Sequence, residues 1–414
     1  MAFRPNPLLS IASILTSMTL SAIGSGVMFA YVPFTLSSEG YPEWIAGSAV
    51  TAIAAGGILG CLMAGPLIRR VGHARMYACF AALIILSTGL IALGVIPYAW
   101  LASRFIYGVA ANGIFIVTQS WLNYSSDNSW RGKAMSVFYM MFVIGMGVGS
   151  FLFGSLPDNG ANAPVVAILF YACGILPIGL TRLATPPPPE KTEIDLRTTW
   201  KISPVGLVGI LASGGLSMLI QGFTPIYATQ SGFGQSQVAT LMFLMQLGML
   251  AVQLPLGAIS DQIDRRYVLA GVCVLVATMA FTATLTPMTG LVLVAIIFAI
   301  WSGATETIYS VAHAHANDRA DPDDFVPLAS TMLVAWSAAA FVVPAIVTGL
   351  TPVFGPKTFM YAAVILASAT LAFVVYRLTQ RDAVPEVESE AFEVRSAQIA
   401  NAELLVNPEE TMPY

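Results

Sequence analysis

Two charged side chains, Arg104 and Glu306, stand inside long apolar stretches of the chain. An ionised side chain deep in a bilayer costs at least roughly 2.5–3.5 kcal/mol, so such residues usually face a wet cavity or a partner. A carboxyl group that meets first one aqueous side and then the other can take up and release a proton. We therefore expect Glu306 to carry a proton, and Arg104 to attract an anionic or polar group near the outer mouth of a cavity.

Both residues also have a simpler interpretation that the sequence leaves open. Glu306 could be satisfied by neighbours such as Tyr309. Arg104 lies about one turn inside its apolar stretch, so its side chain could reach the membrane interface. Counted at 1.5 Å per residue, Arg104 and Glu306 differ by about 16 Å in depth, which predicts separate tasks rather than a direct ion pair.

Other polar and aromatic residues in the apolar stretches are candidates for lining the same cavity. A buried amide either bonds a neighbouring helix or faces water, and the sequence does not distinguish the two. Besides Arg104 and Glu306, the candidates for substrate and proton coupling are Tyr31, Asn112, Gln221, Gln246 and Trp336.

No catalytic or metal-binding constellation accompanies these residues in the sequence. It has no HExxH pair, no nucleophile elbow and no glycine-rich phosphate loop before a lysine. His313 and His315 are two positions apart and therefore point to different faces of a helix. The four cysteines lie inside apolar stretches, at spacings that suit neither a metal site nor a disulfide framework. We expect no enzyme activity, no cofactor and no metal.

The composition places these residues in a membrane. Charged residues make up 10% of the chain, against about 25% in soluble domains. Hydrophobic residues make up 57% and the mean hydropathy is +0.77, which leaves too little polar surface for a water-soluble protein. A span needs about 20 mostly apolar residues. We therefore predict an all-α membrane protein with twelve spans, at residues 9–34, 43–68, 75–95, 100–121, 133–155, 163–183, 204–229, 235–259, 267–286, 289–312, 325–350 and 356–378.

Basic residues fall mainly on one side of these spans. Sixteen of the 18 lysines and arginines lie in the N-terminus, in the loops after even-numbered spans or in the C-terminal tail. Lys357 lies on the opposite side and Arg104 lies within a span. Because loops rich in lysine and arginine stay in the cytoplasm, we expect both termini there, in agreement with an even number of spans.

A short charged turn occurs twice, after the second and after the eighth predicted span. In each copy a glycine is followed four residues later by a charged residue and then by a basic cluster, and the copies are 192 residues apart. A repeat of this length indicates a duplicated bundle. The residues of the two turns are Gly65, Arg69, Arg70, Gly72 and Arg75, then Gly257, Asp261, Arg265 and Arg266.

The repeat divides the chain into four predicted regions. Residues 1–183 form an N-terminal six-helix bundle and residues 204–380 a C-terminal one. Four prolines at 186–189 and the mixed charges after them indicate an extended cytoplasmic linker over 184–203. Residues 381–414 form an acidic tail with seven glutamates, a composition typical of a solvated, disordered segment.

Twelve spans in two halves with these turns resemble the major facilitator superfamily of secondary transporters. Its loop motif is glycine, three residues, aspartate, arginine, any residue, glycine and two basic residues. The second copy matches through Gly257, Asp261, Arg265 and Arg266, whereas in the first copy Arg69 stands where the family has aspartate. Arg104 and Gly108 resemble the second motif of the family.

Two further segments resemble a little-understood bacterial branch of this superfamily, the YcaD-like transporters. One contains Trp121 and Asn123, and the other contains His315, Asn317 and Asp318. The resemblance implies two pseudo-symmetric six-helix bundles that rock about a central site, lined by the first, fourth, seventh and tenth spans. It also implies that the two charged turns act as cytoplasmic gates.

These expectations describe a secondary active transporter that moves a small organic solute by alternating access and is coupled to protons. The expected place is the bacterial cytoplasmic membrane, with the chain acting as a monomer. The expected partners are a small-molecule substrate, protons and the lipid bilayer, with no nucleic acid. A membrane receptor or scaffold that uses the acidic tail, and a passive facilitator, remain alternatives.

Overall fold

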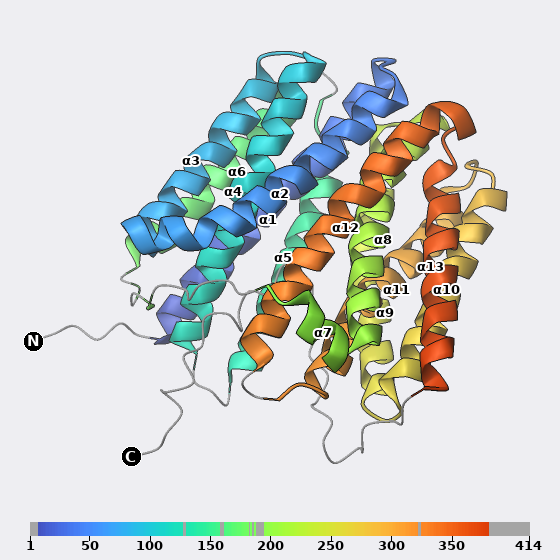
Figure 1. The fold of residues 1–414 in the computed structure, drawn as a ribbon. Helices are drawn as coiled ribbons and strands as arrows, with labels where there is room; N and C mark the ends of the chain where they lie inside the picture. Colours follow the sequence, from blue (N-terminus) through green and yellow to red (C-terminus); the bar gives the residue numbers. More distant parts are fainter. Residues whose placement is uncertain are drawn as a thin grey trace, which may run out of the picture.

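The computed structural model describes residues 7–126, 130–157, 161–181, 183, 186–187, 194–321 and 324–380. The regular structure of these residues is entirely helical, and twelve of the helices are long and apolar enough to cross a membrane (Figure 1). The predicted all-α fold and the predicted number of spans are confirmed. The predicted acidic tail, 381–414, lies outside the described residues, as do parts of the predicted linker.

The first half of the chain contributes six long helices. They are α1 (Pro7–Ser38), α2 (Glu43–Val71), α3 (His73–Ala92), α4 (Pro97–Ser125), α5 (Arg131–Phe153) and α6 (Asn162–Leu180). The helix α4 is longer than its predicted span at both ends. It begins at Pro97, whose fixed φ suits a first helical position.

The second half begins with a short helix and continues with six long ones. They are α7 (Leu196–Ile202), α8 (Pro204–Gln230), α9 (Gln235–Ser260), α10 (Arg265–Leu285), α11 (Leu291–Asn317), α12 (Phe325–Phe354) and α13 (Thr358–Leu378). The prediction of an extended chain was wrong over α7. This turn of helix is capped by Asp195, whose Oδ1 accepts a 2.9 Å hydrogen bond from the amide of Thr198.

The two halves repeat the same packing. In the first half α1 packs on α4, α5 and α6, α2 packs on α4, and α3 packs on α4 and α6. In the second half α8 packs on α11, α12 and α13, α9 packs on α11, and α10 packs on α11 and α13. The pairs correspond one to one, so the two halves are pseudo-symmetric bundles, seen side by side in Figure 1 with the first half on the left.

Two close backbone contacts fix the register of this repeat. Gly56 of α2 packs directly on the carbonyl oxygen of Phe105 in α4, and Gly248 of α9 packs on the carbonyl oxygen of Ala299 in α11. A β-carbon would collide with that oxygen in either place, so glycine is required for the close approach. The glycines are 192 residues apart and the carbonyls 194, so a position on α4 corresponds to the position 194 residues later on α11.

The bundles meet along α2 with α12 and along α5 with α9. Gln235 at the start of α9 donates through Nε2 to the carbonyl oxygens of Phe153 at 2.7 Å and Leu156 at 3.0 Å. Gly47 near the start of α2 packs against Thr348 near the end of α12. Both contacts lie where α5 and α12 end and α2 and α9 begin, opposite the end at which α1 begins and α13 ends. The halves are therefore joined at that end.

Candidate functional site

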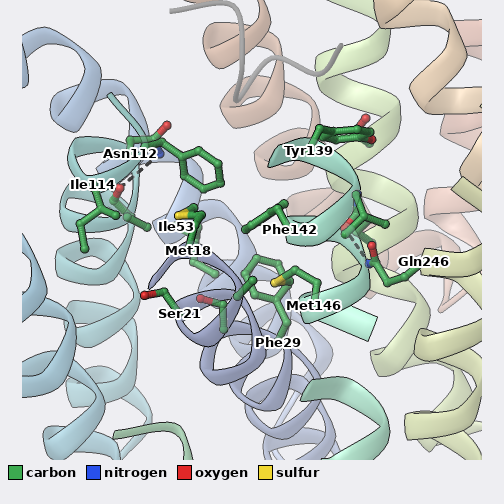
Figure 2. Close-up of a pocket in the computed structure, with 18 of the residues that line it drawn as sticks. Met18, Ser21, Phe29, Ile53, Asn112, Ile114, Tyr139, Phe142, Met146 and Gln246 are labelled. Carbon is green, nitrogen blue, oxygen red and sulfur yellow. Dashed lines mark hydrogen bonds between the residues drawn. The ribbon is translucent and has the colours of Figure 1, made fainter. Parts of the chain in front are cut away.

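A cavity of about 120 Å³ lies between the two bundles. Its walls come from α1 to α5 of the first half and from α8, α9, α11 and α12 of the second. Five of the seven candidates for substrate and proton coupling line it: Asn112, Gln221, Gln246, Glu306 and Trp336. Figure 2 shows Asn112 on one wall and Gln246 on the opposite one.

Glu306 is buried in this cavity and bonded to α8. Its Oε1 accepts a 2.6 Å hydrogen bond from the hydroxyl of Ser217 and a longer one of 3.4 Å from Nε2 of Gln221. Nε2 of Gln246 in turn lies 3.5 Å from Oε1 of Gln221. These neutral groups, and not Tyr309, are the described partners of the carboxyl group. They form a polar chain from α11 through α8 to α9.

Tyr139 of α5 lines the same cavity from the first half (Figure 2). Its side chain is buried, its hydroxyl has no hydrogen-bond partner among the described residues, and it lies near enough to Glu306 for the two to interact electrostatically. The sequence did not single out Tyr139 or Ser217. Ser217 could have been found from its spacing of four residues to Gln221, which places both on one helix face. A lone tyrosine in an apolar span gives no such signal.

Asn112 occupies on α4 the position that Glu306 occupies on α11, 194 residues later. Its Nδ2 donates to the carbonyl oxygen of Gly108 at 3.2 Å, and Sγ of Cys61 lies 3.7 Å from its Oδ1. The two halves therefore present one amide and one carboxyl group to the cavity from equivalent places.

Arg104 lies beside this cavity rather than in its lining. It lines a smaller cavity of about 20 Å³ whose walls include Phe29 and Ile53, two residues that also line the central one. The side chain is 1% exposed and its guanidinium carbon is 4.8 Å from the centroid of the Tyr107 ring. No guanidinium nitrogen has a hydrogen-bond partner among the described residues. Arg104 therefore does not extend to the molecular surface, and the alternative of snorkelling is wrong in this structure.

Three hydroxyl groups gather close to Arg104 on the first half. The hydroxyl of Tyr107 donates to Oγ of Ser25 at 2.7 Å, and the hydroxyl of Tyr171 lies 3.3 Å from the same oxygen. Tyr107 and Ser25 also line the central cavity. The cluster therefore connects the buried guanidinium to the cavity wall.

Tyr31 takes no part in either cavity lining. Its ring packs against Trp100 at 5.6 Å and against Phe153 at 6.0 Å between centroids. The structure thus places this candidate in an aromatic cluster away from Glu306.

The second charged turn forms an ionic network that joins α10 to α11 through the buried side chains of Arg265 and Asp318. Nε of Arg265 donates to Oδ2 of Asp318 at 2.6 Å, and its Nη1 lies 3.7 Å from Oδ1 of Asp261. Nη2 of Arg266 donates to Oδ2 of Asp264 at 2.6 Å. Asp318, from the segment that resembles the YcaD-like transporters, thus forms an ion pair with Arg265 of the loop motif. Gly257, the first residue of the turn, is buried in the last part of α9.

Two more residues of the branch-like segment lie close to this network. His315 is buried, and its Nδ1 lies 2.8 Å from Oγ of Ser203 at the start of α8. It lines a small cavity together with Arg266, Arg319 and Arg377. Asn317 at the end of α11 is buried as well.

The first charged turn is built differently. Its basic residues Arg69, Arg70 and Arg75 are exposed, and Gly65 is partly buried near the end of α2. Gly72 joins α2 to α3 with a φ of 86°, which favours glycine. Counted by the repeat, Arg69, His73 and Tyr124 stand where the second half has Asp261, Arg265 and Asp318.

His73 takes the place of Arg265, and its hydrogen-bond partner among the described residues is a serine. Its Nε2 lies 2.9 Å from Oγ of Ser120, and its ring packs 6.2 Å from that of Trp121. Asn123, which with Trp121 carries the resemblance to the bacterial branch, is buried about one turn after Ser120 on α4. Where the second turn has the contact of Arg265 with Asp318, the first thus has a histidine–serine contact.

Comparisons with known proteins agree with this architecture. Residues 9–322 and 205–408 match the Major Facilitator Superfamily. An uncharacterized MFS-type transporter, YcaD, of Escherichia fergusonii is 26% identical over 336 residues, which is 80% of this chain and 86% of that protein.

Solved transporters share the fold. The nucleoside transporter NupG, as its D323A mutant, superposes with a TM-score of 0.72 at 10% identity, covering 89% of this chain and 100% of that one. A POT family transporter in complex with a thioalcohol-conjugated peptide gives a TM-score of 0.71 at 11% identity, covering 89% and 95%.

The apolar helices and the bacterial relatives identify a multi-pass protein of the inner membrane. Two bundles of six membrane helices, the repeated turn and the match over most of the sequence lead to one conclusion. The chain belongs to the Major Facilitator Superfamily of transporters.

Proposed function

We propose that this protein is a secondary active transporter that moves a small organic solute by alternating access, coupled to protons through Glu306. The observation that carries the proposal is the position of Glu306. It is buried at the boundary of two bundles, in a shared cavity, and its described partners are neutral.

A buried carboxyl group suits proton coupling because its charge is costly away from water. An ionised carboxylate in apolar surroundings is stable only when it is paired or hydrogen-bonded. Ser217 and Gln221 supply donors to one oxygen of Glu306 but no compensating charge. A proton or a positively charged ligand therefore completes the site, and the exchange of one for the other couples two fluxes.

The way in which the bundles touch supports alternating access. At one end, α2 with α12 and α5 with α9 join the halves. At the other end, Arg265 and Asp318 join α10 to α11 within one bundle, next to the turn after α9. We propose that the halves rock about the cavity, and that the charged turns favour one state by about 1–3 kcal/mol, a typical coupling energy.

The basic loops give the orientation. The turns with Arg69 and Arg265 lie at the end where α1 begins and α13 ends. Because basic loops stay on the cytoplasmic side, we place this end and both termini in the cytoplasm. The end at which the two bundles are joined then faces outward. The transporter acts as a monomer, since each copy of the chain supplies both bundles and the whole cavity.

The experiment uses proteoliposomes that hold the pH dye pyranine and wild-type or Glu306→Gln protein. Solutes come from a thermal-shift screen of a metabolite and drug library against the purified protein. We expect an active solute to change the internal pH in wild-type vesicles and not in Glu306→Gln vesicles. Glu43→Gln, at the start of α2 and outside the cavity, is the control and keeps the response. An undiminished response of Glu306→Gln would overturn the coupling role.

A further inference from the structure

The central cavity combines a single carboxylate with walls made largely of aromatic and methionine side chains. Among the described residues that line it, Glu306 is the only one with an ionisable carboxylate, and none is a lysine, arginine or histidine. Six aromatic side chains, Phe142 and Trp336 among them, and four methionines, including Met146, make up much of the remaining wall. In Figure 2, Phe142 and Met146 lie between the wall with Asn112 and the wall with Gln246.

One oxygen of the carboxylate is left for a ligand. Both hydrogen bonds that Glu306 receives from described residues, from Ser217 and from Gln221, end on Oε1. The carboxylate therefore keeps Oε2 for a ligand in the cavity. A positive group placed there would offset the cost of burying the negative charge.

The walls suit the rest of such a ligand. Aromatic faces attract a cation by about 0.5–2 kcal/mol each, more when water is excluded. Methionine side chains are flexible and polarizable, so they adapt to apolar bodies of different shape. The buried guanidinium of Arg104 lies in a separate small cavity that shares Phe29 and Ile53 with the central one. It lies 4.8 Å from the centroid of the Tyr107 ring, and Arg104 is not among the residues that line the central cavity.

We propose that the cavity binds an organic cation, an ammonium-type group on an apolar or aromatic body, with Glu306 as its counter-ion. The inference rests on the proposed function, because it names the solute that the transporter carries. The proton and the cation neutralise the same carboxylate, so they exclude each other. Entry of the cation releases the proton to water, which makes the transporter an exchanger.

The other polar residues that line the cavity with Glu306 do not change charge in the working range. Tyr139 of α5 and Tyr107 of α4 are phenols, which stay neutral near pH 7. Asn112, Gln221 and Gln246 in the same lining are amides. The pH dependence of cation binding is therefore set by one carboxyl group. Arg104 in the smaller cavity keeps its positive charge throughout and adds no pH dependence.

The test uses three probes of similar shape that differ in charge. They are benzyltrimethylammonium, benzyl alcohol and benzylsulfonate, bound to the purified full-length protein in detergent and followed by calorimetry. Because a quaternary ammonium group cannot titrate, its pH dependence reports the protein alone. We expect the ammonium probe to bind at least about tenfold more tightly than the sulfonate, and to bind more tightly as the pH rises.

Two variants and one control complete the design. Glu306→Gln removes the charge and is expected to weaken ammonium binding at least about tenfold and to abolish its pH dependence, with binding of benzyl alcohol unchanged. Trp336→Leu keeps the carboxylate but removes an aromatic face, and is expected to weaken the ammonium probe more than the alcohol. Glu43→Gln is expected to bind like the wild type. An unchanged thermal unfolding temperature shows that each variant is folded.

Preference for the sulfonate, or ammonium binding that Glu306→Gln leaves unchanged, overturns the inference. The binding experiment uses no membrane and no gradient, so its failure differs from that of the proposed function. If solutes move protons in proteoliposomes but the cavity prefers the sulfonate, the proposed transport is supported and the proposal of a cationic solute is contradicted. If the ammonium probe binds through Glu306 but moves no protons, the proposed binding site is supported and the proposed proton coupling is contradicted.

Discussion

Asn112 and Glu306 face the same cavity from equivalent positions on α4 and α11. The repeat places the two residues 194 positions apart, in bundles that pack their helices in the same pairs. A symmetric scaffold thus carries an asymmetric charge. The protonatable group lies on one bundle, and a neutral amide whose side chain is one methylene shorter lies on the other.

Asn112→Asp tests this asymmetry by giving both bundles a carboxyl group. A second negative charge in the cavity is expected to strengthen binding of benzyltrimethylammonium by roughly 1 kcal/mol, about fivefold. The measurement is calorimetry at neutral pH. Asn162→Asp, the same change at the start of α6 and outside the cavity, serves as the control. Equal affinities for wild type and Asn112→Asp would count against a shared cavity.

Ser217→Ala removes the shortest hydrogen bond to Glu306. A donor to a carboxylate favours its ionised form, and such bonds contribute about 1.5–3 kcal/mol. We expect the pH of half-maximal solute-triggered proton movement to rise by about one unit in this variant. Pyranine fluorescence at a series of pH values measures it.

Ser213→Ala is the matched control for this substitution. Ser213 lies one turn earlier on α8 and is also buried, and its hydroxyl has no hydrogen-bond partner among the described residues. The control is expected to keep the wild-type pH profile. Equal shifts in the two variants would show that the effect comes from packing on α8 and not from the bond to Glu306.

Asp318→Asn breaks the buried ion pair with Arg265 between α10 and α11. Both side chains are about 5% exposed or less, and Nε of Arg265 lies 2.6 Å from Oδ2 of Asp318. Removing one partner of a buried pair typically costs about 3–5 kcal/mol, because the other charge stays buried. We expect a clear fall in the thermal unfolding temperature in detergent. Asp321→Asn, at an exposed position just beyond α11, is expected to unfold like the wild type.

Asp264→Asn tests the contact with Arg266 through its dependence on pH. Burial raises the pKa of Asp264, but hydrogen bonds from the side chain and the amide of Arg266 outweigh it and leave the pKa below the usual 3.8. A lowered folded-state pKa gives stability that is present above the usual value and is lost as the pH falls through the folded value.

The wild type is therefore expected to unfold at a higher temperature than Asp264→Asn at neutral pH. The difference is expected to shrink as the pH falls below about 3.8. Unfolding curves of both proteins between about pH 3 and pH 7 measure it. A difference that stays constant over this range contradicts the role of the carboxylate.

The sequence predicted the architecture well because a bilayer imposes simple rules. Long apolar runs must be helices, since backbone groups find no water in the hydrocarbon. Basic loops and the turn at Gly257 then revealed the repeat. Arg104 and Glu306 stood out because charge is costly in an apolar span. The structure buries both: Glu306 lines the central cavity, and Arg104 lines a separate smaller one.

The parts that the sequence did not predict depend on contacts between distant helices. Serine is common in membrane helices, so Ser217 carries no signal until α8 packs on α11. Tyr139 reaches the cavity only through the packing of the two bundles. The short helix α7 was missed because the proline run before it suggested an extended chain, whereas the cap at Asp195 starts a helix.

The central claim is that Glu306 exchanges a proton for the solute. The most direct measurement counts protons released when a solute found in the screen binds to purified protein in weakly buffered detergent solution. We expect the wild type to release a proton near the pH of half-maximal binding, and Glu306→Gln to bind the solute weakly and to release none. Equal proton release by the two proteins would contradict it.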